Sequence, residues 1–106
     1  MTEQDSISLY KHGMQKFFEQ DFLGAITDFS HALELDPTFA DVHLSLAHCY
    51  EKLGDIDKAL ASAKKAVEYN PQDFLTHTSL SIFYQRKGLI VEAEREKELA
   101  AKLQNQ

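Results

Sequence analysis

The fold of this chain is decided by residues 43–71, which read HLSLAHCYEKLGDIDKALASAKKAVEYNP. Apolar and small residues recur there every three or four positions, a periodicity typical of amphipathic helices. Gly54 and Asp55 interrupt the pattern, since glycine can end one helix and aspartate can cap the next. Pro71 stops the second helix. The stretch therefore predicts two helices joined by a tight turn.

The same pattern recurs at a spacing of 34 residues on both sides of this stretch. The matching positions are Pro37 and Pro71; Ala25, Ala59 and Ala93; Ala32, Ala66 and Ala100; Leu46 and Leu80; Tyr50 and Tyr84; and Gly54 and Gly88. A fixed period indicates a repeat array, because a single helix pair cannot bury its own apolar face. We expect six helices, at about 6–20, 22–35, 40–53, 56–69, 74–87 and 90–104.

The spacing within each unit identifies the kind of repeat. The first unit contains Leu9-x-x-His12-Gly13 and Ala25-x-x-x-Phe29, the second His43-x-x-Leu46-Ala47-x-x-Tyr50 and Ala59-x-x-x-Ala63, and the third His77-x-x-Leu80-Ser81-x-x-Tyr84. These motifs resemble the tetratricopeptide repeat over about residues 6–105. The resemblance implies an all-α, right-handed superhelical array of three helix-turn-helix repeats, at about 6–39, 40–73 and 74–106. We expect them to form one domain over residues 1–106.

Composition excludes several classes of function. The net charge of −6 argues against nucleic acid, which needs a basic stripe. No apolar run approaches the ~20 residues of a membrane span, and the acidic start at residues 1–5 differs from a secretory signal. The single cysteine, Cys49, allows no internal disulfide. We therefore expect a cytoplasmic chain without membrane insertion.

The charge is unevenly spread along the chain. Residues 1–40 carry 2 basic and 7 acidic groups, whereas residues 74–106 carry 5 and 4. The difference fits solvated outer faces, and it also fits head-to-tail electrostatic contact between protomers.

Catalytic and metal chemistry find no support in the sequence. The five histidines are His12, His31, His43, His48 and His77, and no two of them have the i, i+4 spacing that places imidazoles on one helix face. We interpret the equivalent residues His43 and His77 as packing histidines and Asp55 as a helix cap. We expect no catalytic residue, no metal, no cofactor and no enzyme activity.

The resemblance implies that the first helices line a concave groove for a peptide. The groove residues predicted here are Tyr10, Met14, Phe17, Leu44, Ser45, His48, Leu75, Ser79 and Ile82. Five of them, Tyr10, Met14, Leu44, Leu75 and Ile82, are apolar or amphipathic where packing of the repeat does not itself require it. The pattern favours a protein-interaction module that binds an apolar or amphipathic segment of a protein partner. Two alternatives stay open: weak self-association of a homo-oligomeric scaffold through the same face, and isolated surface apolar residues without a function.

One subclass of the family can be tested by its residues. Its co-chaperones clamp the C-terminal carboxylate of chaperone tails ending in Glu-Glu-Val-Asp with lysine, asparagine and arginine side chains. The matching positions here hold Tyr10, Met14, Ser45, Leu75 and Ser79. None is a cation, so the charge-assisted bonds to a terminal carboxylate are absent. We expect such a tail not to be a partner.

The third unit differs from the others along its second helix. Glu94 corresponds to Ile26 and Leu60, and Lys97 corresponds to Phe29 and Ala63. Polar residues at sites that would face a further unit indicate a cap facing water. We expect the array to end there, with the charged segment 92–98 as a solvated helix.

Overall fold

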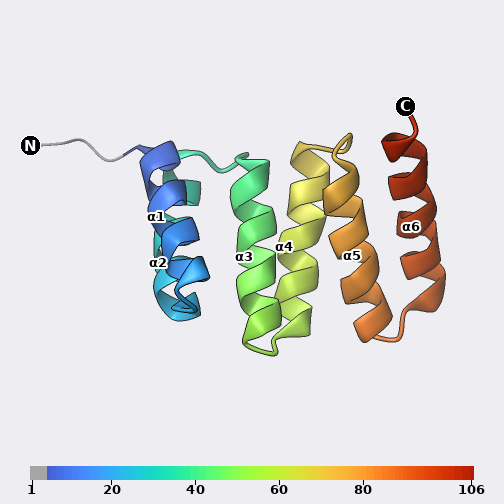
Figure 1. Cartoon of the computed structure of the whole chain (residues 1–106), viewed down its shortest axis with the longest axis horizontal. Helices are drawn as coiled ribbons and strands as arrows, with labels where there is room; N and C mark the ends of the chain where they lie inside the picture. The colour runs from blue at the N-terminus through green and yellow to red at the C-terminus, as the bar shows by residue number, and fades with distance from the viewer. Residues whose placement is uncertain (1–4) are drawn as a thin grey trace, which may run out of the picture.

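Residues 5–106, the part of the chain that the computed structural model describes, form six helices and no strand, and the three helix pairs follow one another along the longest axis (Figure 1). The helices are α1 (Ser6–Phe18), α2 (Phe22–Leu35), α3 (Ala40–Lys52), α4 (Ile56–Tyr69), α5 (Phe74–Arg86) and α6 (Ile90–Gln104). All six predicted helices are confirmed, and the first helix of each pair ends one or two residues earlier than expected. The acidic start, residues 1–4, lies outside the described residues.

The turn inside each helix pair is closed by a residue with a left-handed backbone. Gly54 and Gly88 both have a φ of 84°, as their predicted role in ending a helix requires. Gln20 occupies the equivalent place in the first pair, with a φ of 66°. Glycine adopts this conformation freely, whereas a residue with a Cβ atom is strained in it. The first turn therefore has the same shape as the others at a higher energy.

Aspartates begin four of the helices. The side chains of Asp5, Asp21, Asp55 and Asp73 accept hydrogen bonds from backbone N–H groups in the following turn, at 2.7 to 3.2 Å. Such bonds satisfy donors that the helix itself leaves unpaired. The bond from the Ser8 N–H also lowers the pKa of Asp5 below its usual value. The predicted cap at Asp55 is confirmed, and part of the acidic charge of the chain has a structural role.

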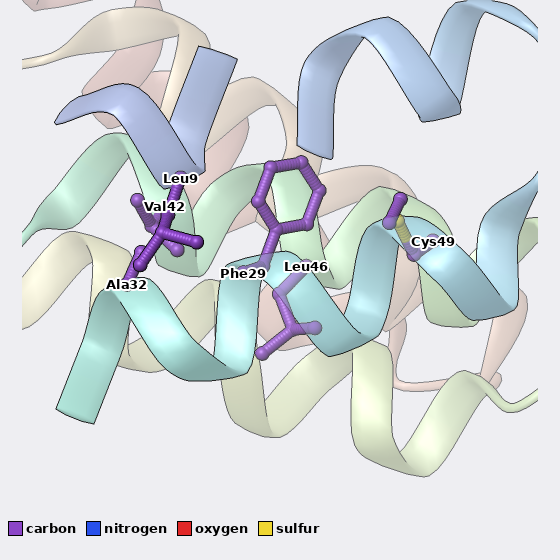
Figure 2. Packing of buried hydrophobic residues seen from close by; sticks show 7 residues of the cluster. Leu9, Phe29, Ala32, Val42, Leu46 and Cys49 are labelled. Atoms are coloured by element: carbon purple, nitrogen blue, oxygen red, sulfur yellow. The ribbon is translucent and has the colours of Figure 1, made fainter. Parts of the chain in front are cut away.

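The first core cluster forms where α3 packs on α1 and α2 (Figure 2). Its largest side chain, Phe29 of α2, is fully buried. The ring fills the space beside Gly13 of α1, where an added Cβ atom would lie 2.4 Å from it. On the α3 side the cluster contains the small Cys49. The large ring of Phe29 is thus accompanied by a small residue on α1, Gly13, and another on α3, Cys49.

The second cluster forms where α5 packs on α3 and α4. Its large and small side chains come from different helices than those of the first cluster. The equivalents of Gly13, Phe29 and Cys49, 34 residues later, are Ala47, Ala63 and Phe83. The large ring now comes from the incoming helix, and the groove that receives it is lined with alanine. Close packing is kept because large and small side chains alternate across the interface.

The two equivalent histidines lie against the turn that precedes their helix. Nε2 of His43 lies 2.8 Å from the Pro37 carbonyl oxygen, and Nε2 of His77 lies 2.8 Å from that of Pro71. His77 is 4% exposed, and its Nδ1 lies 2.5 Å from a carboxylate oxygen of Glu96 on α6. His43 is only half-buried. Both are packing histidines, as the sequence predicted, and His77 also links α5 to α6.

Candidate functional site

Helix α3 touches α1 on one side and α5 on the other along one face, which we call the first-helix face. The Ser45 hydroxyl donates to the Met14 sulfur at 3.4 Å, joining α3 to α1. Ser79 Oγ lies 3.3 Å from His48 Nε2, joining α5 to α3. Met14, Phe17, Ser45 and His48 also enclose a small cavity of about 60 Å³. The structure therefore brings five of the predicted groove residues into one line.

Exposed apolar side chains lie toward the two ends of this face. Leu75 at the start of α5 is 58% exposed, and Phe18 at the end of α1 is 74% exposed. A shallow depression lies over Phe18, Tyr10 and Met14. Leu44, by contrast, is half-buried.

The side chains of Tyr10 and Met14 contribute to core packing, which the sequence did not predict. Both pack against the first core cluster. The Tyr10 ring lies 5.2 Å from the Phe39 ring and 6.1 Å from the Phe29 ring, measured between centroids. The expectation that packing does not require these two residues is wrong, because both contact the buried cluster and Phe39, from the turn before α3, packs on Tyr10.

A polar network links α3 to α5 near the C-terminal ends of the two helices. Nδ1 of His48 lies 3.4 Å from one carboxylate oxygen of Glu51, and Arg86 from α5 forms an ion pair with the other at 3.3 Å. The Arg86 side chain is about half exposed while that of Glu51 is largely buried. A guanidinium has five N–H donors, so Arg86 keeps donors for an acceptor on a partner. Sequence reasoning missed this pair, since its members are 35 residues apart on different helices.

A cavity of about 400 Å³ opens between α5 and α6 at the C-terminal end of the array. Its walls are formed by Thr78, Ser81, Ile82, Gln85, Ile90, Ala93, Glu94, Lys97, Ala100, Ala101 and Gln104. Ile82, one of the predicted groove residues, lines this cavity. Glu94 and Lys97 are exposed, as the predicted cap requires, yet they leave a hollow between the helices.

Residues 5–106 contain no cluster of metal ligands, and their cysteine thiol is not activated. No group of three histidine, cysteine, aspartate or glutamate side chains within residues 5–106 is placed to hold a metal ion. Burial raises the pKa of the Cys49 thiol to about 11, so it stays protonated at neutral pH. The helices described here also include none that is long and apolar enough to cross a membrane.

The paired helices, their 34-residue period and their packing match a known family. The family model for the tetratricopeptide repeat aligns with residues 19–81, more than half of the chain. The chain belongs to the tetratricopeptide repeat family. Among curated proteins, the Protein SGT1 homolog of Bos taurus is 35% identical over 63 residues, covering 59% of this chain and 19% of that protein.

A second relative is Hsp70-Hsp90 organizing protein 3 of Arabidopsis thaliana, 32% identical over 74 residues, covering 70% of this chain and 12% of that protein. The chain thus spans less than a fifth of the length of these curated relatives.

Solved structures share the fold over nearly the whole chain. A crystal structure of MamA superposes with a TM-score of 0.91 at 25% identity, covering 95% of this chain and 59% of that one. The first TPR of Spaghetti (RPAP3) bound to the HSP90 peptide SRMEEVD superposes with a TM-score of 0.90 at 18% identity, covering 97% and 82%.

The RPAP3 structure corrects part of one expectation. In that protein a backbone of this shape accommodates a peptide ending in Glu-Glu-Val-Asp. Excluding such a tail from this family member was therefore wrong in part. In this chain the positions that match the family's carboxylate clamp still hold Tyr10, Met14, Ser45, Leu75 and Ser79, none of which is a cation.

Proposed function

We propose that this chain is a protein-interaction module without chemistry of its own, acting as one domain in the cytoplasm. Its first-helix face would hold an apolar or amphipathic segment of a partner protein. The observation that carries the proposal is the continuous line of Met14, Ser45, His48 and Ser79, with exposed apolar side chains toward both of its ends. Exposed apolar residues that border such a face are suited to a partner that covers them.

The affinity expected from this face is modest. Burying an apolar side chain such as Leu75 contributes about 1.5–3 kcal/mol, and association costs about 4–15 kcal/mol in lost motion. Two or three such anchors contribute about 3–9 kcal/mol, so with a few hydrogen bonds the dissociation constant should be about micromolar at its tightest. Arg86, already held in place by Glu51, can add a hydrogen bond to a partner acceptor with little further ordering.

A pair of matched double variants tests the proposal. Leu44→Glu with Leu75→Glu places two charges on the first-helix face, where a partner would have to desolvate them. Leu23→Glu with Leu35→Glu makes the same chemical change at exposed positions of α2. We expect the first variant to lose partner binding in pull-down and titration, and the second to keep it, with both retaining wild-type helicity and a cooperative thermal melt.

Other outcomes separate the alternatives. If the folded Leu44→Glu, Leu75→Glu variant retains every partner, the first-helix face is not the binding surface. If the wild type forms a concentration-dependent dimer in sedimentation that this variant alone loses, the face serves self-association. Titration with SRMEEVD and its C-terminally amidated form shows whether a chaperone tail binds through its terminal carboxylate.

A further inference from the structure

The groove between the two helices of a pair is filled by the first helix of the next pair. Helix α3 fills the groove of α1 and α2, and α5 fills that of α3 and α4. The cavity between α5 and α6 lies at the equivalent place in the third pair. The structure thus contains two filled examples of a groove whose third copy is open.

The two helices that fill these grooves present a common pattern. The residues that α3 places in or against the first cluster are Val42, Leu46, Cys49 and Tyr50, and those at equivalent positions of α5 are Thr76, Leu80, Phe83 and Tyr84. Both sets have a β-branched residue at i, leucine at i+4, an apolar residue of variable size at i+7 and tyrosine at i+8. Residues at this spacing share one face of a helix.

The size of the residue at i+7 is complementary to the size of the residue that lines the groove. The first groove carries the large Phe29, and its occupant has the small Cys49. The second groove carries Ala63, and its occupant has the large Phe83. The equivalent residue of the open groove is Lys97. A long cationic side chain calls for a residue at i+7 that leaves room for it and carries the opposite charge, which an aspartate or glutamate does.

The other residues of the open groove can accommodate a helix with this residue pattern. Ala93 and Ala100 form a nearly buried floor, and Ile82 and Ile90 are half exposed on the walls. Small floor residues allow a further helix to approach closely, as Ala59 and Ala66 do in the second pair. The apolar walls lose contact with water only when such a helix is present.

A second copy of this chain does not offer the pattern through its own first helix. The positions of α1 that correspond to i, i+4, i+7 and i+8 hold Ser8, His12, Gln15 and Lys16. None is apolar, so stacking α1 of another copy into the groove would bury polar groups against Ile82 and Ile90. Helix α1 of a second copy is therefore not a suitable occupant.

We propose that the groove between α5 and α6 is a second binding site, independent of the first-helix face. It takes one amphipathic partner helix with a β-branched residue, leucine, an acidic residue and an aromatic residue at i, i+4, i+7 and i+8. The acid pairs with Lys97, and the leucine and aromatic side chains cover Ile82, Ile90 and the alanine floor.

The probe is a helix-stapled peptide of residues 73–87 of this chain carrying Phe83→Glu, compared with the unaltered stapled peptide. Stapling is needed because isolated helices of this length are marginal in water. We expect the glutamate peptide to bind the full chain about 10-fold more tightly, the gain of one well-placed ion pair. Amide shifts in NMR should map to Ala93, Ala100 and Ile82.

The variant Lys97→Ala makes the test specific, because it gives the open groove the alanine of the second groove. The peptide preference should then reverse in favour of the unaltered Phe83 peptide. The Leu44→Glu, Leu75→Glu variant should bind the glutamate peptide as the wild type does, which separates this site from the proposed function. Absence of shifts at about 1 mM peptide, shifts confined to other faces, or a preference that Lys97→Ala leaves unchanged would each overturn the proposal.

Discussion

The first core cluster should tolerate the side chains of the second, provided that they are exchanged together. The triple substitution Gly13→Ala, Phe29→Ala and Cys49→Phe gives the first groove and its occupant the alanine, alanine and phenylalanine found one repeat later. If the two clusters fill the same volume in different ways, the triple variant keeps most of the stability that each single substitution loses. Large and small residues would then be exchanged without a change in the backbone.

The magnitudes follow from the contacts. Phe29→Ala empties a fully buried site and should cost about 3–5 kcal/mol. Gly13→Ala places a Cβ atom 2.4 Å from the Phe29 ring; overpacking of ~1–3 kcal/mol, offset by ~1 kcal/mol of helix propensity, leaves a loss of ~0–2. Cys49→Phe adds a ring to a filled core, at about 1–3 kcal/mol. The singles sum to about 4–10 kcal/mol, whereas the triple variant should lose at most about 2.

Urea denaturation followed by far-ultraviolet circular dichroism measures these differences, and a complete set of single, double and triple variants gives the coupling energy. A domain of this size has a stability of about 5–15 kcal/mol, so the losses are resolvable. A favourable coupling of at least about 2 kcal/mol is expected. A triple variant that loses the sum of the single losses would refute the volume exchange, and with it the reason for assigning an acid opposite Lys97.

Three further predictions concern local features. Gln20→Gly should stabilise the chain by about 0.5–1 kcal/mol in thermal melts, because glycine adopts the left-handed backbone conformation without strain. The reverse substitution at the equivalent position, Gly54→Gln, should destabilise the chain by about as much or more. The buried Cys49 thiol, with its raised pKa, should react with a thiol reagent at pH 8 on the order of 100-fold more slowly in the folded chain than in urea. His77→Ala should cost about 3–5 kcal/mol in urea denaturation because it leaves a largely buried carboxylate without its partner, whereas His43→Ala, at the half-buried equivalent site, should cost about 1–2. Equal losses for the two histidine variants, or a faster reaction of folded Cys49, would contradict the burial on which these values rest.

The helices were predictable because their signals are local. Gly54, Asp55 and Pro71 each act on the backbone within one turn, so the boundaries were expected to within two residues. Gln20 shows the limit of such signals, since nothing in its side chain marks a left-handed position. The 34-residue period predicts that conformation only by analogy with Gly54 and Gly88.

The candidate faces were only partly predictable. The family resemblance implied that Met14, Ser45 and His48 share one face, and the structure brings these side chains together. Periodicity tells only which side of a helix a residue lies on. It does not tell which residues a neighbouring turn covers, so the packing of Phe39 on Tyr10 was not predicted. Contacts such as Glu51 with Arg86 depend on how two repeats are rotated against each other. That rotation is set by the summed packing of both clusters, and no single residue encodes it.

The central claim, that partners bind on the first-helix face, is tested most directly by site-specific photo-crosslinking. A photoreactive amino acid is placed at Ser45 on this face in one variant and at exposed Ala61 on α4 in another. We expect partner adducts from position 45 that disappear when Leu44→Glu and Leu75→Glu are added, and none from position 61. Adducts of equal yield at both positions, or adducts at position 45 that survive the added charges, would contradict it.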